Sequence, residues 1–180
     1  YVTVKSFYNK TPLHKACQNG HLNIVKYLVE NGAFINFENL YNITPLHEAC
    51  KSGHLNIVKY LVENGAYINR VDDWDKIPLH YACEEGYLDI VKYLIEKNGD
   101  INKIPYLYYK LKKHKYAFLR CLIEKHKNQN EITFLHFACK NNHLEIVKYL
   151  VEHGAVINAV NNCEETPLHF ACKNNHLNIV

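Results

Sequence analysis

Several features that mark membrane proteins and enzymes are missing from this chain of 180 residues. No apolar run approaches the roughly 18 residues that a membrane-spanning helix needs, and no signal-peptide pattern opens the sequence. A glycine-rich phosphate loop, a Gly-x-Ser-x-Gly elbow and an HExxH motif are all absent. We therefore expect no transmembrane segment, no enzyme activity and no cofactor.

A four-residue phrase recurs along the chain at a fixed interval. It reads Thr-Pro-Leu-His at Thr11–His14 and Thr44–His47, and Ile-Pro-Leu-His at Ile77–His80, so the spacing between these copies is constant. After a longer gap it resumes at Thr133–His136, and it returns at Thr166–His169 after the original interval. A period of about 33 residues is typical of a solenoid of stacked repeats, which offers an extended surface for recognition.

The residues around the first copy indicate a helix, a turn and a second helix. Thr11 suits the N-cap, where its hydroxyl can accept from a backbone amide of the first turn, and Pro12 suits the first helical position, where no amide is needed. Gly20 can adopt the left-handed conformation that ends this helix, and His21–Val29 has the apolar spacing of a second one. Asparagine, the next-best residue for that conformation, replaces the glycine in the last two copies.

The full unit reads TPLHxAC and then GHLxIVKYLVExGAxIN, and it is written almost verbatim three times. This unit resembles the ankyrin repeat, and the resemblance covers nearly everything from Thr11 to Val180. It implies an all-α solenoid of stacked helix-turn-helix units with short β-hairpin fingers. It also implies a curved array in which the fingers and first helices line a concave face that binds a partner.

The repeat period divides the chain into one solenoid domain of consecutive units. The chain contains no methionine, and its last residues, His176–Val180, match only the start of a second helix. We therefore expect it to be a piece of a longer array. The expected segments are the end of a truncated repeat at 1–10, ankyrin repeats at 11–43 and 44–76, a repeat with a shortened finger at 77–104, a degenerate basic repeat at 105–132, an ankyrin repeat at 133–165 and a truncated repeat at 166–180.

Five of the seven cysteines occupy the same position in their repeats. Residues at one position of neighbouring repeats should lie about one helix spacing apart, roughly 8 to 10 Å, whereas a disulfide bond needs Cα atoms within about 7 Å. We expect buried, free thiols in a reducing compartment, and hence a cytoplasmic or nuclear location. These cysteines are Cys17, Cys50, Cys83, Cys139 and Cys172.

Histidine and cysteine also recur close together, as at His14, Cys17 and His21, which raises the hypothesis of a metal site. A zinc site has four ligands at site-specific spacing, whereas here both residue types return once per repeat, as the leucines do. In the ankyrin family the motif histidine supports the start of the first helix by hydrogen bonding near the threonine. We therefore expect structural roles for His14 and His21 and their equivalents, and no metal.

Positions that differ between copies while the frame stays constant are the candidates for recognition, because the ankyrin resemblance implies partner contacts there. One such position follows the motif histidine, and others lie at the finger tips. Phe137 and Phe170 share the first of these positions, and we interpret them as packing residues. The candidate partner-binding residues are Lys15, Phe37, Tyr41, Glu48, Arg70, Asp72, Asp73, Trp74 and Tyr81.

Trp74 is the only tryptophan in the chain and lies among three acidic residues, Asp72, Asp73 and Asp75. An aromatic side chain surrounded by charge is a common form of binding hot spot. The alternative is that Trp74 only packs on the neighbouring finger, against Tyr41. The sequence leaves both interpretations open.

The degenerate repeat is strongly basic. Residues 103–130 hold eight lysine and arginine residues against one glutamate. Clustered lysines raise the local potential and could attract nucleic acid or an anionic surface. Alternatively, the acidic repeat before it neutralises this charge, and no RNP-type or helix-turn-helix signature accompanies the lysines. The basic patch in question is Lys110, Lys112, Lys113 and Lys115.

These patterns together favour a non-enzymatic protein–protein interaction scaffold, monomeric within a longer chain. One repeat frame serves unrelated targets, so the expected partner is a protein of unspecified identity. The alternative is a targeting or substrate-recruiting arm of a larger enzyme or membrane protein. A further alternative is contact with nucleic acid or an anionic surface through the basic repeat.

Overall fold

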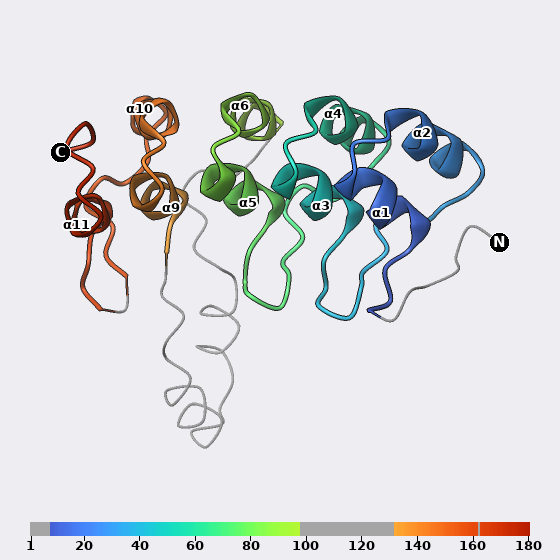
Figure 1. Ribbon diagram of the computed structural model, residues 1–180, viewed down its shortest axis with the longest axis horizontal. Coiled ribbons are helices and arrows are strands. Elements are labelled where there is room, and N and C mark those ends of the chain that lie inside the picture. The colour runs from blue at the N-terminus through green and yellow to red at the C-terminus, as the bar shows by residue number, and fades with distance from the viewer. Residues whose placement is uncertain (1–7, 98–131, 162) are drawn as a thin grey trace, which may run out of the picture. The chain divides into compact units, whose positions relative to one another are not determined.

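The computed structural model describes residues 8–97, 132–161 and 163–180 (Figure 1). They fall into two compact units, one within residues 1–99 and one within residues 100–180. The expected basic patch of Lys110, Lys112, Lys113 and Lys115 lies outside the described residues. Its predicted contacts with nucleic acid or an anionic surface therefore stay a prediction.

All regular secondary structure in the described ranges is α-helical. Within these ranges the first unit contains three pairs of short helices, and the second contains one pair and a further helix. The helices are α1 (Pro12–Gln18), α2 (Leu22–Glu30), α3 (Pro45–Lys51), α4 (Leu55–Glu63), α5 (Pro78–Glu85), α6 (Leu88–Glu96), α9 (Phe134–Lys140), α10 (Leu144–Glu152) and α11 (Pro167–Lys173).

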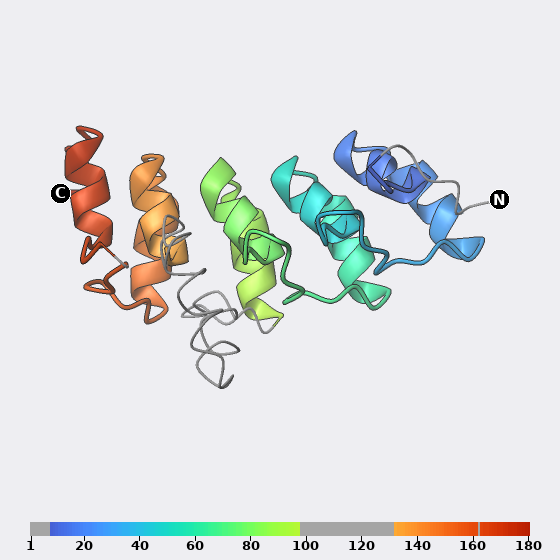
Figure 2. The ribbon, with the colours of Figure 1, turned by 90° about the horizontal axis from the view of Figure 1, so that it is seen from below.

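Within the first unit the helix pairs stack side by side in chain order (Figure 2). Helix α1 packs against α3 and α3 against α5, while α2 packs against α4 and α4 against α6. The fingers between the pairs project on the side of the first helices, away from the second helices (Figure 1). In the second unit α9 packs against both α10 and α11.

The fingers contain no β-strand in the residues that the structure describes, although the ankyrin resemblance implied short β-hairpins. Each of the first two instead closes in a tight turn with a backbone hydrogen bond, from Asn39 N to Ile43 O and from Asp72 N to Lys76 O, both at 3.0 Å. Oδ1 of Asn39 also accepts from the backbone amides of Tyr41 at 2.8 Å and Ile43 at 3.0 Å. An asparagine or aspartate that binds the turn amides in this way holds the finger without a strand ladder.

The first helix begins at a threonine and histidine pair, as predicted. Thr11 is the N-cap of α1, Pro12 is its first residue, and the backbone amide of Thr11 donates to Nδ1 of His14 at 3.2 Å. Because Nδ1 accepts this hydrogen bond, the ring proton is on Nε2. Nε2 donates it to the backbone oxygen of Ile43 at 2.9 Å, at the end of the following finger.

The same histidine bridge recurs in other repeats. The ring of His47 accepts from the backbone amide of Thr44 at 3.1 Å and donates to the backbone oxygen of Lys76 at 3.3 Å. In the second unit His136 donates to the backbone oxygen of Glu165 at 3.1 Å. The motif histidine therefore supports the helix start, as predicted, and also connects it to the next finger.

The turn between the two helices of a pair uses the left-handed conformation, as predicted. Gly20 has φ +77°, and asparagine holds the equivalent positions, with φ +62° at Asn142 and +59° at Asn175. A Cβ at Gly20 would lie 2.6 Å from Cε1 of His54, so the turn also lets the next pair approach closely. At Gly32, which ends the second helix with φ +83°, a Cβ would meet nothing within 4 Å.

The repeated cysteines occupy the interior of the stack. Cys17, Cys50, Cys83 and Cys139 are buried free thiols, as predicted. Burial raises the pKa of each thiol, to about 11 for Cys139, so they stay protonated at neutral pH. Cys172 is exposed, and the prediction is wrong for this residue, because no helix in the described ranges covers that side of α11.

The two kinds of glycine give a matched test of close packing between repeats. Both Gly20→Ala and Gly32→Ala force a left-handed residue, at roughly 1 to 2 kcal/mol each. Only Gly20→Ala also displaces the His54 side chain, which adds on the order of 1 kcal/mol to the loss of stability. We therefore expect Gly20→Ala to lower the free energy of unfolding more than Gly32→Ala in urea titrations. Equal losses in the two variants would show that the contact with His54 contributes nothing.

Candidate functional site

The first unit has an open hollow between its finger tips and its first helices. Its volume is about 310 Å³. Residues from α1, α3 and α5, from both fingers and from the segment before α1 form its wall. They are Tyr8, Lys10, Gln18, Asn39, Tyr41, Ile43, His47, Glu48, Lys51, Trp74 and Tyr81.

Three aromatic rings at the finger tips form one row along the edge of the hollow, which we call the tip ladder. Tyr8, Tyr41 and Trp74 follow one another at exactly the repeat period. Their ring centroids lie 6.1 Å apart for the first pair and 5.3 Å for the second. Each ring keeps 40% to 50% of its surface exposed, so the ladder is ordered yet accessible. The predicted contact between Trp74 and Tyr41 is thus confirmed, and it leaves Trp74 available for a partner.

Backbone contacts between neighbouring tips hold the ladder in place. The amide of Leu40 donates to the backbone oxygen of Tyr8 at 3.2 Å, and the amide of Asp73 donates to that of Tyr41 at 3.1 Å. Within the second tip, Oδ1 of Asp72 accepts from the amide of Trp74 at 2.8 Å. The rings therefore project from short turns whose own hydrogen bonds are made before any partner arrives.

Tyr81 forms the floor of the hollow. Its hydroxyl donates to Oδ2 of Asp72 at 2.6 Å, and its ring meets the ring of His47 edge-on, with centroids 5.9 Å apart. The ammonium groups of Lys51 and Lys76 lie 5.8 Å and 5.1 Å from the Tyr81 ring centroid. Burial, followed by the bond to Asp72, raises the pKa of Tyr81, so the hydroxyl stays protonated and acts only as a donor to Asp72.

Most charged groups around the hollow are already paired. Nζ of Lys10 lies 2.6 Å from Oε1 of Glu48, whose side chain is almost fully buried. Lys51 also lines the hollow, and in the described part of the chain no carboxylate lies within ion-pair distance of it. The wall therefore carries one ion pair and one further cation.

A family model described as ankyrin repeats (3 copies) matches residues 2–72, 38–104 and 107–180. The chain belongs to the ankyrin-repeat family. Ankyrin repeats are generally protein–protein interaction modules and are typically non-catalytic, and the predicted all-helical solenoid is confirmed. No curated protein matches this chain. Among the helices in the described ranges, none is both long and apolar enough to cross a membrane.

Four of the residues predicted from the ankyrin pattern line the hollow together: Tyr41, Glu48, Trp74 and Tyr81. The side chain of Asp72 lies beneath it, 4% exposed and fully engaged by the tip turn and Tyr81. That geometry gives Asp72 a structural role in shaping the tip.

The other predicted residues of this ankyrin array lie outside the hollow. Arg70 pairs with Glu38 of the preceding finger, and a carboxylate oxygen of Asp73 accepts from the side-chain amide of Asn42. Lys15 is exposed on α1, and Phe37 packs edge-on against His14, with centroids 6.4 Å apart. In the second unit Phe137 and Phe170 are buried, which agrees with their interpretation as packing residues.

Sequence reasoning missed several wall residues that the ankyrin period itself could have found. Tyr8 precedes Tyr41 by one repeat period, the same interval that separates Tyr41 from Trp74. Gln18 and Lys51 also share a variable repeat position, one helical turn after the position that follows the motif histidine. Because residues three apart lie on one helix face, Gln18 and Lys51 lie on the same faces of α1 and α3 as the variable residues Lys15 and Glu48.

His47 adds a titratable group to the wall, but burial keeps it uncharged. Burial lowers the pKa of His47 to about 4, against an ordinary value of 6.5. A protonated ring would lose the acceptor that Thr44 uses at the helix start. The neutral ring therefore contributes stability that is complete above pH 6.5 and is lost as the pH falls toward 4.

Comparing wild type with His47→Gln tests this linkage. Between pH 7 and pH 5 we expect the unfolding free energy of wild type to fall by about 2 kcal/mol more than that of the variant. Burial and the nearby Asp72 and Asp73 raise the pKa of Asp75 to about 6, which acts in the opposite direction but in both proteins alike. Urea titrations at the two pH values measure the difference, and parallel losses would contradict a neutral buried ring.

Proposed function

We propose that this chain is a non-enzymatic interaction module that binds a protein partner through the face formed by the finger tips and first helices of its first unit. The tip ladder of Tyr8, Tyr41 and Trp74 carries this proposal. Its rings stay about half exposed beside a hollow of about 310 Å³. Tyrosine and tryptophan dominate the energetic centres of protein interfaces, where they fill pockets or stack on partner side chains.

The order of this face before binding also supports the proposal. Each ladder ring packs on its neighbour, and turns closed by Asn39 and Asp72 hold the backbone beneath Tyr41 and Trp74. Binding therefore immobilises little that is not already ordered, which reduces the entropic cost of association. Glu48 and Tyr81 complete the face as wall and floor of the hollow.

The remaining predictions fit around this core. If this chain is instead a targeting or substrate-recruiting arm of a larger enzyme or membrane protein, it would bind its partner through the same face. Lys15, Phe37, Arg70 and Asp73 are then peripheral contacts around the hollow. A cytoplasmic location and a monomeric state also stay predictions.

Trp74→Ala tests the proposed face directly. Loss of a central aromatic anchor typically costs about 2 kcal/mol or more, so we expect partner binding to weaken about 30-fold or more. The measurement is quantitative affinity capture with immobilised protein, followed by titration of the recovered partner. Because Trp74 is the only tryptophan, its fluorescence in wild type also reports the binding directly.

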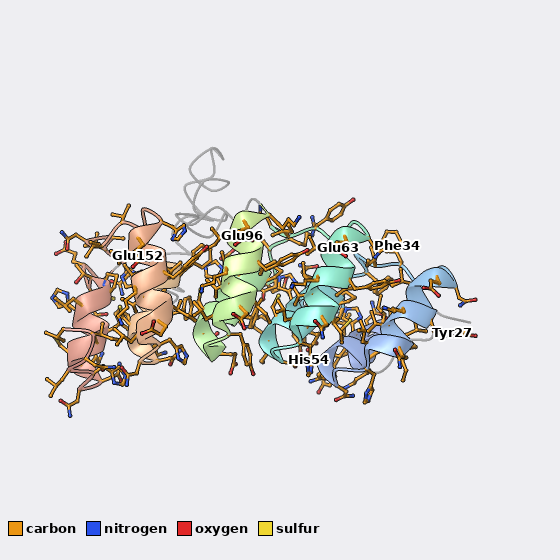
Figure 3. All side chains as sticks on the ribbon, turned by 90° about the horizontal axis from the view of Figure 1, so that it is seen from above. Tyr27, Phe34, His54, Glu63, Glu96 and Glu152 are labelled. Carbon is orange, nitrogen blue, oxygen red and sulfur yellow. The ribbon has the colours of Figure 1, made fainter. Side chains whose placement is uncertain are left out.

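The matched control is Tyr27→Ala on α2, which is the second helix of its pair (Figure 3). Tyr27 is 66% exposed and lies outside the hollow, so its removal also deletes an exposed aromatic ring of the same unit. We expect this variant to retain the wild-type partners at wild-type affinity. The proposal fails if Trp74→Ala captures the same proteins in the same amounts while its thermal unfolding shows that it is folded.

A further inference from the structure

We propose that the hollow accepts the carboxylate of a glutamate or aspartate side chain, presented by an extended partner segment with an apolar or aromatic residue beside it. This inference rests on the proposed function and specifies the partner's chemistry. Lys51 would bind the carboxylate, and the adjacent apolar residue would pack on Tyr41 and Trp74.

The charges of the wall carry the first step. Three ionisable side chains of permanent charge line the hollow: Lys10, Glu48 and Lys51. Lys10 and Glu48 neutralise each other at 2.6 Å, with side-chain exposures of 20% and 7%. His47 adds no charge at neutral pH, because burial lowers its pKa. A net charge of one positive unit remains, and it belongs to Lys51.

Lys51 is an exposed residue, so a ligand can reach its ammonium group. Its ammonium group lies 5.8 Å from the centroid of the Tyr81 ring, at the last residue of α3. Aromatic rings around an ammonium group exclude water from one side, and an ion pair strengthens as its surroundings become less polar. A carboxylate that enters the hollow would thus meet a cation that forms no ion pair with a described carboxylate.

The hydrogen-bonding groups of the wall point to the same ligand chemistry. Oε1 of Gln18 accepts from Nζ of Lys15 at 3.1 Å, which fixes the amide orientation because an ammonium group can only donate. The amide nitrogen of Gln18 is therefore a donor on the wall. By contrast, Oδ1 of Asn39 is occupied by two backbone amides and Glu48 by Lys10. Gln18 and Lys51 thus offer donors to a ligand that brings acceptors.

A carboxylate fits this balance better than a phosphorylated residue or a basic side chain. One carboxylate neutralises the single unpaired cation of the wall, whereas a phosphate group brings up to two negative charges near Glu48. A lysine or arginine of the partner would face Lys51 with no unpaired carboxylate on the wall. The acidic residues Asp73 and Asp75 flank Trp74 at the finger tip and do not line the hollow, whereas Lys51 lies on α3, which places the ligand's carboxylate at the α3 side.

Selection from a phage-displayed library of random peptides tests the proposal without a known partner. The library is selected on wild type, on Lys51→Glu, on Lys51→Met and on Trp74→Ala. We expect wild type to enrich peptides with aspartate or glutamate beside an apolar or aromatic residue, and Lys51→Glu to lose them in favour of lysine or arginine. Lys51→Met keeps the apolar part of the side chain and should lose only the acidic preference.

Lys26→Glu is the matched control for charge reversal. Lys26 lies 5.8 Å from the Tyr60 ring centroid, the same distance as Lys51 from Tyr81, but on the second helices and outside the hollow. We expect it to select the wild-type peptides.

A synthetic copy of an enriched peptide is then titrated by Trp74 fluorescence. The titration measures the coupling free energy between Lys51 and the acidic residue of the peptide. Replacing its acidic residue by the amide should weaken binding about tenfold on wild type and hardly at all on Lys51→Met.

The outcomes show whether the carboxylate assignment fails alone or together with the interaction face. Peptides that depend on Trp74 but show no acidic preference, or that Lys51→Glu selects unchanged, overturn the carboxylate assignment and leave the interaction face standing. A phosphoserine peptide that binds more than tenfold tighter than its glutamate version also overturns it. The absence of any Trp74-dependent peptide overturns both proposals.

Discussion

The first unit depends on a buried, uncharged histidine that forms hydrogen bonds through both ring nitrogens. His14 and His47 each accept from the amide that begins their own helix and donate to the base of the following finger. This arrangement works only while the ring is neutral, because a protonated ring has no acceptor. Burial lowers the pKa of both rings, so the packing that excludes water also preserves the hydrogen bonds.

Because each finger is anchored at its base, a short turn is enough to form its tip and to hold one side chain in a defined position. Asn39 and Asp72 occupy the same place in their turns, and the residue two positions later, Tyr41 or Trp74, projects an aromatic ring. Since the fingers recur at a constant interval and stack in order, equal positions meet as neighbours. The tip ladder and the hollow beside it therefore follow from repetition of one anchored turn. The same turn carries a tyrosine at position 41 and a tryptophan at position 74, so the exposed ring differs between repeats while the turn beneath it is the same.

The frame was predictable from sequence because each of its parts has a local physical signature. Threonine and proline mark a helix start, and a glycine or asparagine marks the left-handed turn, as at Gly20 and Asn142. The predicted β-hairpin fingers did not form as strands in the described residues, since the Asx turns take up the backbone amides instead. The exposure of Cys172 was also not predictable, because burial depends on which helices cover a position.

The candidate site was predictable in part, for a related reason. Variation between copies identified Tyr41, Glu48, Trp74 and Tyr81, but it could not tell that the carboxylate of Asp72 turns under the tip to bind Tyr81. Nor could it tell that Glu48 pairs with Lys10 and leaves Lys51 unpaired, since Lys10 and Glu48 belong to different repeats.

The sequence by itself determined the repeat period, the helix starts and stops and the positions free to vary, because these reside in short-range backbone chemistry. Only the tertiary structure decided which side chains share the hollow, which charges cancel and which remain. Those outcomes depend on distances between repeats, and such distances exist only once the helices have stacked.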